Sequence, residues 1–184
     1  MKKIMLHTCC SICFLEPYKY LKENDFEVIA LFNNPNIQPY EEYINRLNAL
    51  KNIVNINNVS LIVPDEYSVE EYNNSVKMFS NVKDLRCKEC YCFRLVKTAE
   101  LSKINKIQYF STTLLASPYQ NIDNIVEIAN KISEEYKLEF IWSRKWPDSY
   151  YKSKNEIRKM RLYTQKYCGC LYSKMERENE LKHN

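Results

Sequence analysis

The chain has 184 residues, which is the length of one ordinary domain, and its net charge is +4. Hydrophobic residues make up 45% and charged residues 27%, close to globular averages, so neither a wholly disordered chain nor a membrane protein fits. There is one glycine, Gly169, where ordinary usage would give about 13. Dinucleotide-binding loops and Walker A loops need several glycines for close backbone approach to phosphate, so both motifs are excluded.

Strand and helix patterns alternate along the chain. The run FEVIALF at 26–32 is rich in β-branched residues and ends at Asn33-Asn34-Pro35, whereas Ile44, Leu47 and Leu50 recur at helical spacing. In chain order we predict strand 2–8, helix 14–23, strand 26–32, helix 41–54, strand 59–63, helices 68–79 and 93–101 on either side of a cysteine segment at 87–92, strand 107–115, helix 122–135 and strand 138–142. Such alternation indicates a single α/β domain over 1–184, with a mostly parallel sheet covered on both faces.

The chain has eight cysteines, and their interpretation depends on whether the protein lies in a reducing or an oxidising cellular compartment. The apolar run behind Met1-Lys2-Lys3 ends at His7, which is too short for a secretory signal. No later stretch approaches the ~20 apolar residues that span a bilayer. The sequence therefore predicts a cytoplasmic protein with no membrane partner. Thiols stay reduced in the cytoplasm, so clustered cysteines indicate metal or redox chemistry before disulfides.

The cysteines fall into three groups, and each group contains a pair spaced as C-x-x-C or C-x-C, which suits two thiolates on one metal or cluster. Cys92 follows a complete pair and is expected to be a packing residue. One zinc needs only four ligands, so two zincs, an iron–sulfur cluster with a further group, or a redundant set all remain open. Since ligands of open α/β sheets bind at the carboxyl ends of the strands, we expect all three groups to meet there. The groups are Cys9, Cys10 and Cys13; Cys87, Cys90 and Cys92; and Cys168 and Cys170.

Positive charge is concentrated in the C-terminal segment 144–184. Residues 144–166 hold eight basic residues against two acidic ones, and the rest of the chain sums to −2. Aromatic residues, among them Trp146 and Tyr151, alternate with these charges. Basic residues interleaved with aromatics suit contact with a phosphate backbone and unstacked bases. A solvated helix face remains the alternative.

Five sequence blocks, in the same order, resemble the cobalamin-independent, iron–sulfur epoxyqueuosine reductases of the QueH family. The resemblance runs through nearly the whole chain. The blocks are HTCC at 7–10 with Cys13, NNPNIQPYEEYINR at 33–46, RCKECYCFRL at 86–95, FSTTLLASPYQNID at 110–123 and YCGCLYS at 167–173.

The resemblance implies a three-layer Rossmann-like fold of the HUP (adenine nucleotide alpha-hydrolase-like) type, a [4Fe–4S] cluster and an additional iron ion. It also implies reduction of epoxyqueuosine to queuosine at the tRNA wobble position, with electrons from an external donor. Four cysteines would hold the cluster and three the iron, with the division left open. The metal ligands carried over by position are Cys9, Cys10, Cys13, Cys87, Cys90, Cys168 and Cys170.

Roles in proton transfer follow only from proximity to these blocks, and roles in substrate binding follow from the basic and aromatic segment 144–166 together with Arg46. We expect His7, Tyr119 and Tyr167 as candidate proton donors. Residues Arg46, Arg144, Lys145 and Trp146 are expected to hold the anticodon loop of tRNA, with Trp146 or a tyrosine stacking on an exposed base. The competing hypothesis is a metal-stabilised RNA-binding module without redox catalysis. A nucleotide-activating enzyme is disfavoured because Cys9-Cys10-Ser11 replaces a glycine-bearing phosphate loop after the first strand.

Overall fold

A parallel sheet forms the centre of the computed structural model, which describes residues 1–182; the last two residues of the basic segment 144–184 lie outside the described residues. Within this range the sheet has five strands in the order β3-β2-β1-β4-β5, and every pairing is parallel. All the predicted strands are present, several of them shorter than expected. Their bounds are β1 Lys2–His7, β2 Phe26–Leu31, β3 Ser60–Ile62, β4 Tyr109–Thr112 and β5 Glu139–Phe140.

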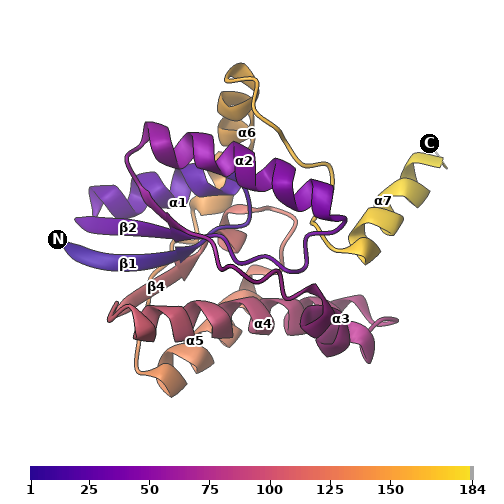
Figure 1. The fold of residues 1–184 in the computed structure, drawn as a ribbon, viewed down its shortest axis with the longest axis horizontal. Coiled ribbons are helices and arrows are strands. Elements are labelled where there is room, and N and C mark those ends of the chain that lie inside the picture. The colour runs from indigo at the N-terminus through magenta and orange to yellow at the C-terminus, as the bar shows by residue number, and fades with distance from the viewer. Residues whose placement is uncertain (183–184) are drawn as a thin grey trace.

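Helices cover both faces of this sheet, which gives the predicted three-layer α/β architecture (Figure 1). Helices α1, α2 and α6 lie on one side, and α4 and α5 lie on the other. The helices of the described chain are α1 Ser11–Glu23, α2 Tyr40–Ile56, α3 Val69–Lys77, α4 Lys83–Ile104, α5 Ile122–Tyr136, α6 Tyr150–Lys159 and α7 Leu171–Lys182, with short 3₁₀ turns η1 Thr113–Ala116 and η2 Trp146–Ser149.

The central strand β1 is buried on both faces. Its residues Ile4, Met5 and Leu6 have no exposed surface, as expected of a strand that carries helices above and below it. Lys2 pairs with Phe26 of β2, and Ile4 pairs with Tyr109 of β4. The order of the strands reverses beside β1, between β1 and β4, and such a switch point is the usual ligand site of an open α/β sheet.

Two predictions about local structure are wrong. The cysteine segment 87–92 does not separate two helices, because α4 runs through it without interruption. Strand 107–115 ends early, because Thr112 caps the 3₁₀ turn η1 through its hydroxyl, which accepts a hydrogen bond from the Leu114 amide at 3.2 Å. The first correction places Cys87 and Cys90 three residues apart on one helix, where their side chains share a face.

Helix α7 differs from the other helices because none of its residues is buried. It projects from the body of the molecule beyond the carboxyl ends of the strands (Figure 1). The middle of α7 is fixed to α4, where Arg86 and Lys83 both form ion pairs with Glu176, at 2.8 and 2.7 Å. Across residues 1–182, no helix combines the length and the apolar character that a bilayer crossing would require.

Candidate metal centre

Three cysteines meet where β1 ends, at the switch point of the sheet. Cys9 and Cys10 follow β1, and Cys13 lies in the first turn of α1. Their sulfur atoms all lie within 4.8 Å of one another, so this cysteine triad (Cys9, Cys10 and Cys13) could hold a metal ion. The neighbouring strand fixes its position, because the Cys9 amide donates to the Thr113 hydroxyl oxygen at 3.1 Å just beyond β4.

The triad lies at the amino end of α1. The Cys10 sulfur accepts a hydrogen bond from the Cys13 amide at 3.4 Å and caps this helix. Helix amino termini favour negative charge, so the cap suits a thiolate. The side-chain hydrogen bond between Cys9 and Cys10 lowers the pKa of the Cys9 thiol, whereas burial raises the pKa of Cys10 to about 12. The three thiols therefore share protons unevenly, and a metal would have to displace them.

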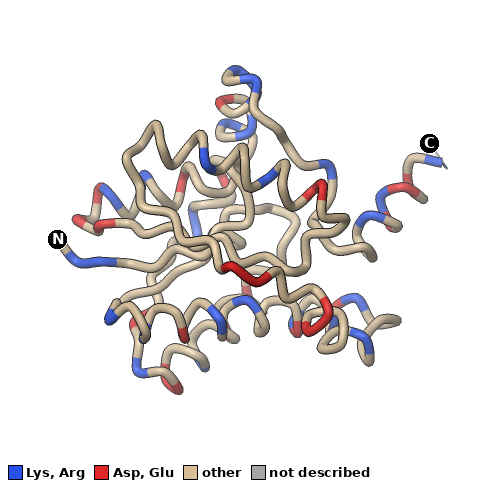
Figure 2. Tube along the Cα trace, viewed as in Figure 1, with Lys and Arg blue, Asp and Glu red and all other residues tan. Residues whose placement is uncertain are grey.

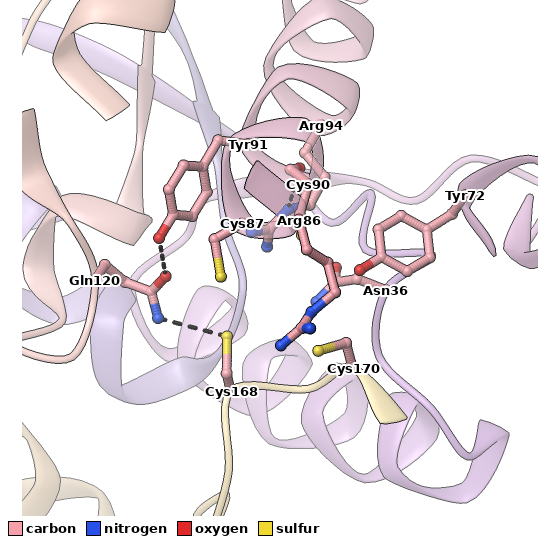
Figure 3. Close-up of a pocket in the computed structure, with 10 residues that line it drawn as sticks. All are labelled: Asn36, Tyr72, Arg86, Cys87, Cys90, Tyr91, Arg94, Gln120, Cys168 and Cys170. Carbon is pink, nitrogen blue, oxygen red and sulfur yellow. Dashed lines mark hydrogen bonds between the residues drawn. The ribbon is translucent and has the colours of Figure 1, made fainter. Parts of the chain in front are cut away.

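Four further cysteines line a separate cavity between α4 and the start of α7. We call them the cysteine tetrad: Cys87 and Cys90 from α4, with Cys168 and Cys170 from the segment before α7. Figure 3 shows the sulfur atoms of Cys87, Cys168 and Cys170 turned toward a common space. Cys170 repeats the arrangement of Cys10, because its sulfur accepts a hydrogen bond from the Ser173 amide at 3.4 Å in the first turn of α7.

The wall of this cavity carries polar atoms without partners. Among the described residues, six buried side-chain polar atoms lack a hydrogen bond, and five of them belong to residues that line the cavity. These are both amide atoms of Asn36, the hydroxyl of Tyr72, Nε of Arg86 and Nη2 of Arg94. Buried polar groups are normally satisfied, so their concentration beside four sulfur atoms fits a cavity that binds a polar, thiolate-ligated group. A [4Fe–4S] cluster, which takes four cysteine ligands, meets both requirements.

Gly169 turns the chain between the two cysteines at 168 and 170. Its φ of +141° lies in the region that favours glycine, and an added Cβ would meet Asn36 Nδ2 and Ile37 Cγ1, each at 3.1 Å. The Gly169 carbonyl accepts a hydrogen bond from the Gln38 amide at 2.9 Å. The cysteine pair is thereby fixed against the loop that follows β2, at the carboxyl edge of the sheet.

The triad and the tetrad are two neighbouring groups, which agrees with the expected division of seven cysteines into three and four. Arg94 interacts electrostatically with Cys90 and Cys168 of the tetrad and with Cys9 of the triad. Each group also receives one glutamine N–H···S hydrogen bond. Gln120 Nε2 donates to Cys168 at 3.4 Å, and Gln165 Nε2 donates to Cys10 at 2.9 Å.

In the described part of the chain, none of the candidate proton donors makes a hydrogen bond to a cysteine. His7 is fully buried, and its two ring nitrogens share hydrogen bonds with Thr112 at 2.9 Å and Asn34 at 3.1 Å. Burial, with the nearby Arg94 charge, lowers the pKa of His7 to about 3, so the ring is neutral. Tyr167 donates its hydroxyl to the Gln38 carbonyl at 2.6 Å, and Tyr119 is exposed.

Two residues expected to contact tRNA are buried instead. Arg46 is 1% exposed and donates to Glu42 Oε1 at 2.7 Å, so it cannot reach a phosphate backbone. Trp146 is also 1% exposed and packs edge-on against Tyr20, with ring centroids 5.6 Å apart, which contradicts stacking on an exposed base. Arg144 and Lys145 are exposed, as the prediction requires.

Cys92 lies apart from the tetrad. It lines a surface groove between α4 and α5, next to Phe79, Glu89 and Ile128. Burial raises the pKa of its thiol above the ordinary value. Its position agrees with the prediction that Cys92 is a packing residue, because a helix turns Cys90 and Cys92 to different faces.

Several residues at the site escaped sequence reasoning. Arg94, Gln120 and Asn36 lie inside the sequence blocks singled out above, yet they are polar residue types that are common at any surface. Tyr150 lies in the basic segment and is buried beside the triad, where burial and the adjacent Cys13 raise the pKa of its hydroxyl. For Arg94, Gln120 and Asn36 the available signal was their position inside those blocks, and that does not reveal which side chains point inward.

Fold and site together define a Rossmann-like α/β protein with two groups of cysteines, a triad and a tetrad, at the switch point of its sheet. Comparison with known proteins makes this class specific. The family model described as "Epoxyqueuosine reductase QueH" matches residues 4–176. A protein of that name from Dehalococcoides mccartyi is 35% identical over 95% of this chain and 94% of its own length. One from Thermotoga maritima is 33% identical over 98% of this chain and 94% of its own length. The chain belongs to the QueH family of epoxyqueuosine reductases, which are oxidoreductases.

Proposed function

We propose that this protein reduces epoxyqueuosine to queuosine at the wobble position of tRNA. The reaction takes up two electrons and two protons, replaces the epoxide by a carbon–carbon double bond and releases the epoxide oxygen as water. The observation that carries the proposal is that the cysteine triad and the cysteine tetrad lie next to each other at the sheet edge of a QueH-family chain. We place the reaction in the cytoplasm, where tRNA is available, with electrons from an external donor.

The division of the cysteines supports a division of cofactors. Four sulfurs line one cavity, which is the number that a [4Fe–4S] cluster takes, so we assign the cluster to the cysteine tetrad. Three sulfurs form the triad, which would leave a coordination position open on an additional iron. When bound, the cluster would relay single electrons, and the iron would polarise the epoxide carbon–oxygen bond as a Lewis acid.

The chain's own residues orient these ligands. The Gln120 amide is held by the Tyr91 hydroxyl, which donates to Gln120 Oε1 at 2.8 Å, so its N–H group is aimed at Cys168. The Gln165 amide likewise donates an N–H group to the sulfur of Cys10. Hydrogen bonds to thiolate sulfur fix ligand geometry and withdraw electron density from the metal. Tyr150 is buried within electrostatic range of the triad, and its ring packs edge-on against Tyr119 and Tyr151.

A basic and aromatic surface next to the triad supports tRNA as the substrate. Figure 2 shows Lys and Arg along α6 and the segment that follows it. The exposed side chains Tyr119 and Tyr151 stand together, with hydroxyl oxygens 3.1 Å apart. We propose that these rings contact the anticodon loop once the wobble nucleotide is turned out of its stack, while Arg144 and Lys145 contact phosphates.

The test is anaerobic reconstitution with iron and sulfide, followed by incubation with epoxyqueuosine-containing tRNA and dithionite. We expect about five iron atoms and four acid-labile sulfides per chain, and queuosine among the nucleosides of the digested tRNA. Cys170→Ala is expected to lower the iron content and abolish turnover. Failure of the iron-loaded wild-type protein to form queuosine would refute the enzymatic proposal, and colourless protein with stoichiometric zinc would favour a structural metal.

A further inference from the structure

Arg94 is a buried cation at the centre of the site. It lies on α4 one helical turn after Cys90, and its side chain is 1% exposed. It lines the tetrad cavity together with the four cysteines (Figure 3). Unlike the cysteines, it has no role in the function proposed above.

The guanidinium of Arg94 lacks an ordinary partner. Its Nε donates to the Cys90 carbonyl at 3.2 Å, and its buried Nη2 atom has no hydrogen-bond partner. Among residues 1–182, Arg94 forms no ion pair with a carboxylate. The other buried arginines differ, because Arg46 pairs with Glu42 at 2.7 Å and Arg86 pairs with Glu176 at 2.8 Å. Since burial of an unpaired charge is costly, an anionic partner is required at this position.

The surroundings of Arg94 identify that partner as thiolate sulfur. Its largest electrostatic interactions are with Cys90 and Cys168 of the tetrad and with Cys9 of the triad, followed by Tyr72. Its positive charge also opposes the effect of burial on the Cys90 thiol, which raises the pKa. The charged guanidinium therefore lies next to Cys90 and within electrostatic range of both cysteine groups, and its Nη2 atom has no hydrogen-bond partner among residues 1–182.

We propose that Arg94 is a positioning residue whose fixed positive charge compensates the metal-bound thiolates of both groups and raises the reduction potential of the tetrad centre. The inference rests on the proposed function, because it requires metal at the cysteines. In the step concerned, one electron passes from an external one-electron reductant to the centre, the reductant is oxidised by one electron and no proton moves. The added electron makes the centre more negative, so a nearby cation stabilises the reduced form.

The experiment is a redox titration of the anaerobically reconstituted protein with dithionite and mediators, followed by electron paramagnetic resonance. Three variants are compared with the wild type: Arg94→Met removes the charge, Arg94→Lys keeps it, and Lys97→Met removes an exposed charge from the same helix. We expect at least a tenfold lower ratio of reduced to oxidised centre in Arg94→Met at a fixed potential, which is a midpoint about 59 mV more negative for one electron. The Lys97→Met midpoint is expected to equal that of the wild type.

A midpoint in iron-loaded Arg94→Met that equals the wild-type value would overturn the inference. If Arg94→Met does not fold or load iron, Arg94→Lys carries the test. If Arg94→Lys retains iron and its midpoint lies within about 59 mV of the wild-type midpoint, charge compensation is supported, and a larger shift of its midpoint refutes it. A wild-type protein without any reducible iron centre would instead refute the proposed function, so the two failures are distinguishable.

Discussion

Arg46 donates a hydrogen bond from Nη1 to the carbonyl oxygen of Cys168 at 2.9 Å, so a residue of α2 holds a cysteine more than a hundred positions later in the chain. Its Nη2 donates to the Tyr167 carbonyl at 3.0 Å, and its Nε is paired with Glu42. Tyr163 also donates its hydroxyl to Glu42. The segment that carries half of the tetrad is thereby fixed to the body of the fold by one buried ion pair.

Replacing Arg46 by Ala should therefore affect stability and metal content together. The change leaves Glu42 buried without its cation and frees two carbonyl groups, and breaking a buried pair costs about 3–5 kcal/mol. We expect a lower midpoint of denaturant unfolding and a loss of iron from the tetrad. Lys51→Ala, on the exposed face of the same helix, is the matched control and should change neither quantity. An Arg46→Ala protein with the full iron content would contradict this role.

Gly169→Ala tests the turn between Cys168 and Cys170. The new methyl group would meet Asn36 and Ile37 at 3.1 Å, at a φ that non-glycine residues rarely adopt. Strain of this kind costs about 1–3 kcal/mol. We expect a reduced iron content after reconstitution, measured colorimetrically per chain, and a lower unfolding midpoint. The exposed Lys166→Ala change, three residues earlier, should leave both values as in the wild type. Equal iron content in the two variants would show that the turn tolerates a side chain.

Cys90→Ser and Cys92→Ser form a matched pair on α4. Cys90 lines the tetrad cavity, whereas Cys92 lines the groove against α5. A serine oxygen is a poor replacement for thiolate on iron, so Cys90→Ser should lose most of the visible absorption of the cluster. Cys92→Ser should retain the absorption and lose at most about 1–2 kcal/mol of folding stability. A bleached Cys92→Ser protein would mean that Cys92 is a ligand after all.

The sequence allowed the order of strands and helices, and therefore the parallel sheet, to be predicted, because buried strands and amphipathic helices have distinct periodicities. Cysteine spacing likewise identified the groups that surround the site. The division into triad and tetrad was not predictable, since it depends on α4 passing unbroken through 87–92 and on Cys10 and Cys170 capping two different helices. Charge patterns also misled, because Arg46 lies in a motif that suits substrate contact but is enclosed by Glu42 and two carbonyl groups.

The exposed cations of α6 give a prediction that does not depend on the metal. Lys152 and Arg158 are exposed, and among the described residues neither forms an ion pair. Each phosphate contact contributes about 0.7 (single strand) to 0.9 (duplex) to the slope of log affinity against log salt concentration. If both residues contact the anticodon arm, each alanine variant should weaken tRNA binding and reduce that slope by about this amount. Filter binding or fluorescence anisotropy over a salt series measures both quantities.

The control for this prediction is Lys103→Ala. Lys103 is also exposed, but it lies at the end of α4, just before β4 begins, and so at the opposite edge of the sheet from the cysteines. Its removal changes the net charge as much as the α6 variants do, so it separates a local contact from a general effect of charge. If Lys103→Ala lowers the slope as much as Lys152→Ala and Arg158→Ala, tRNA is attracted by overall charge alone, and α6 is not its binding surface.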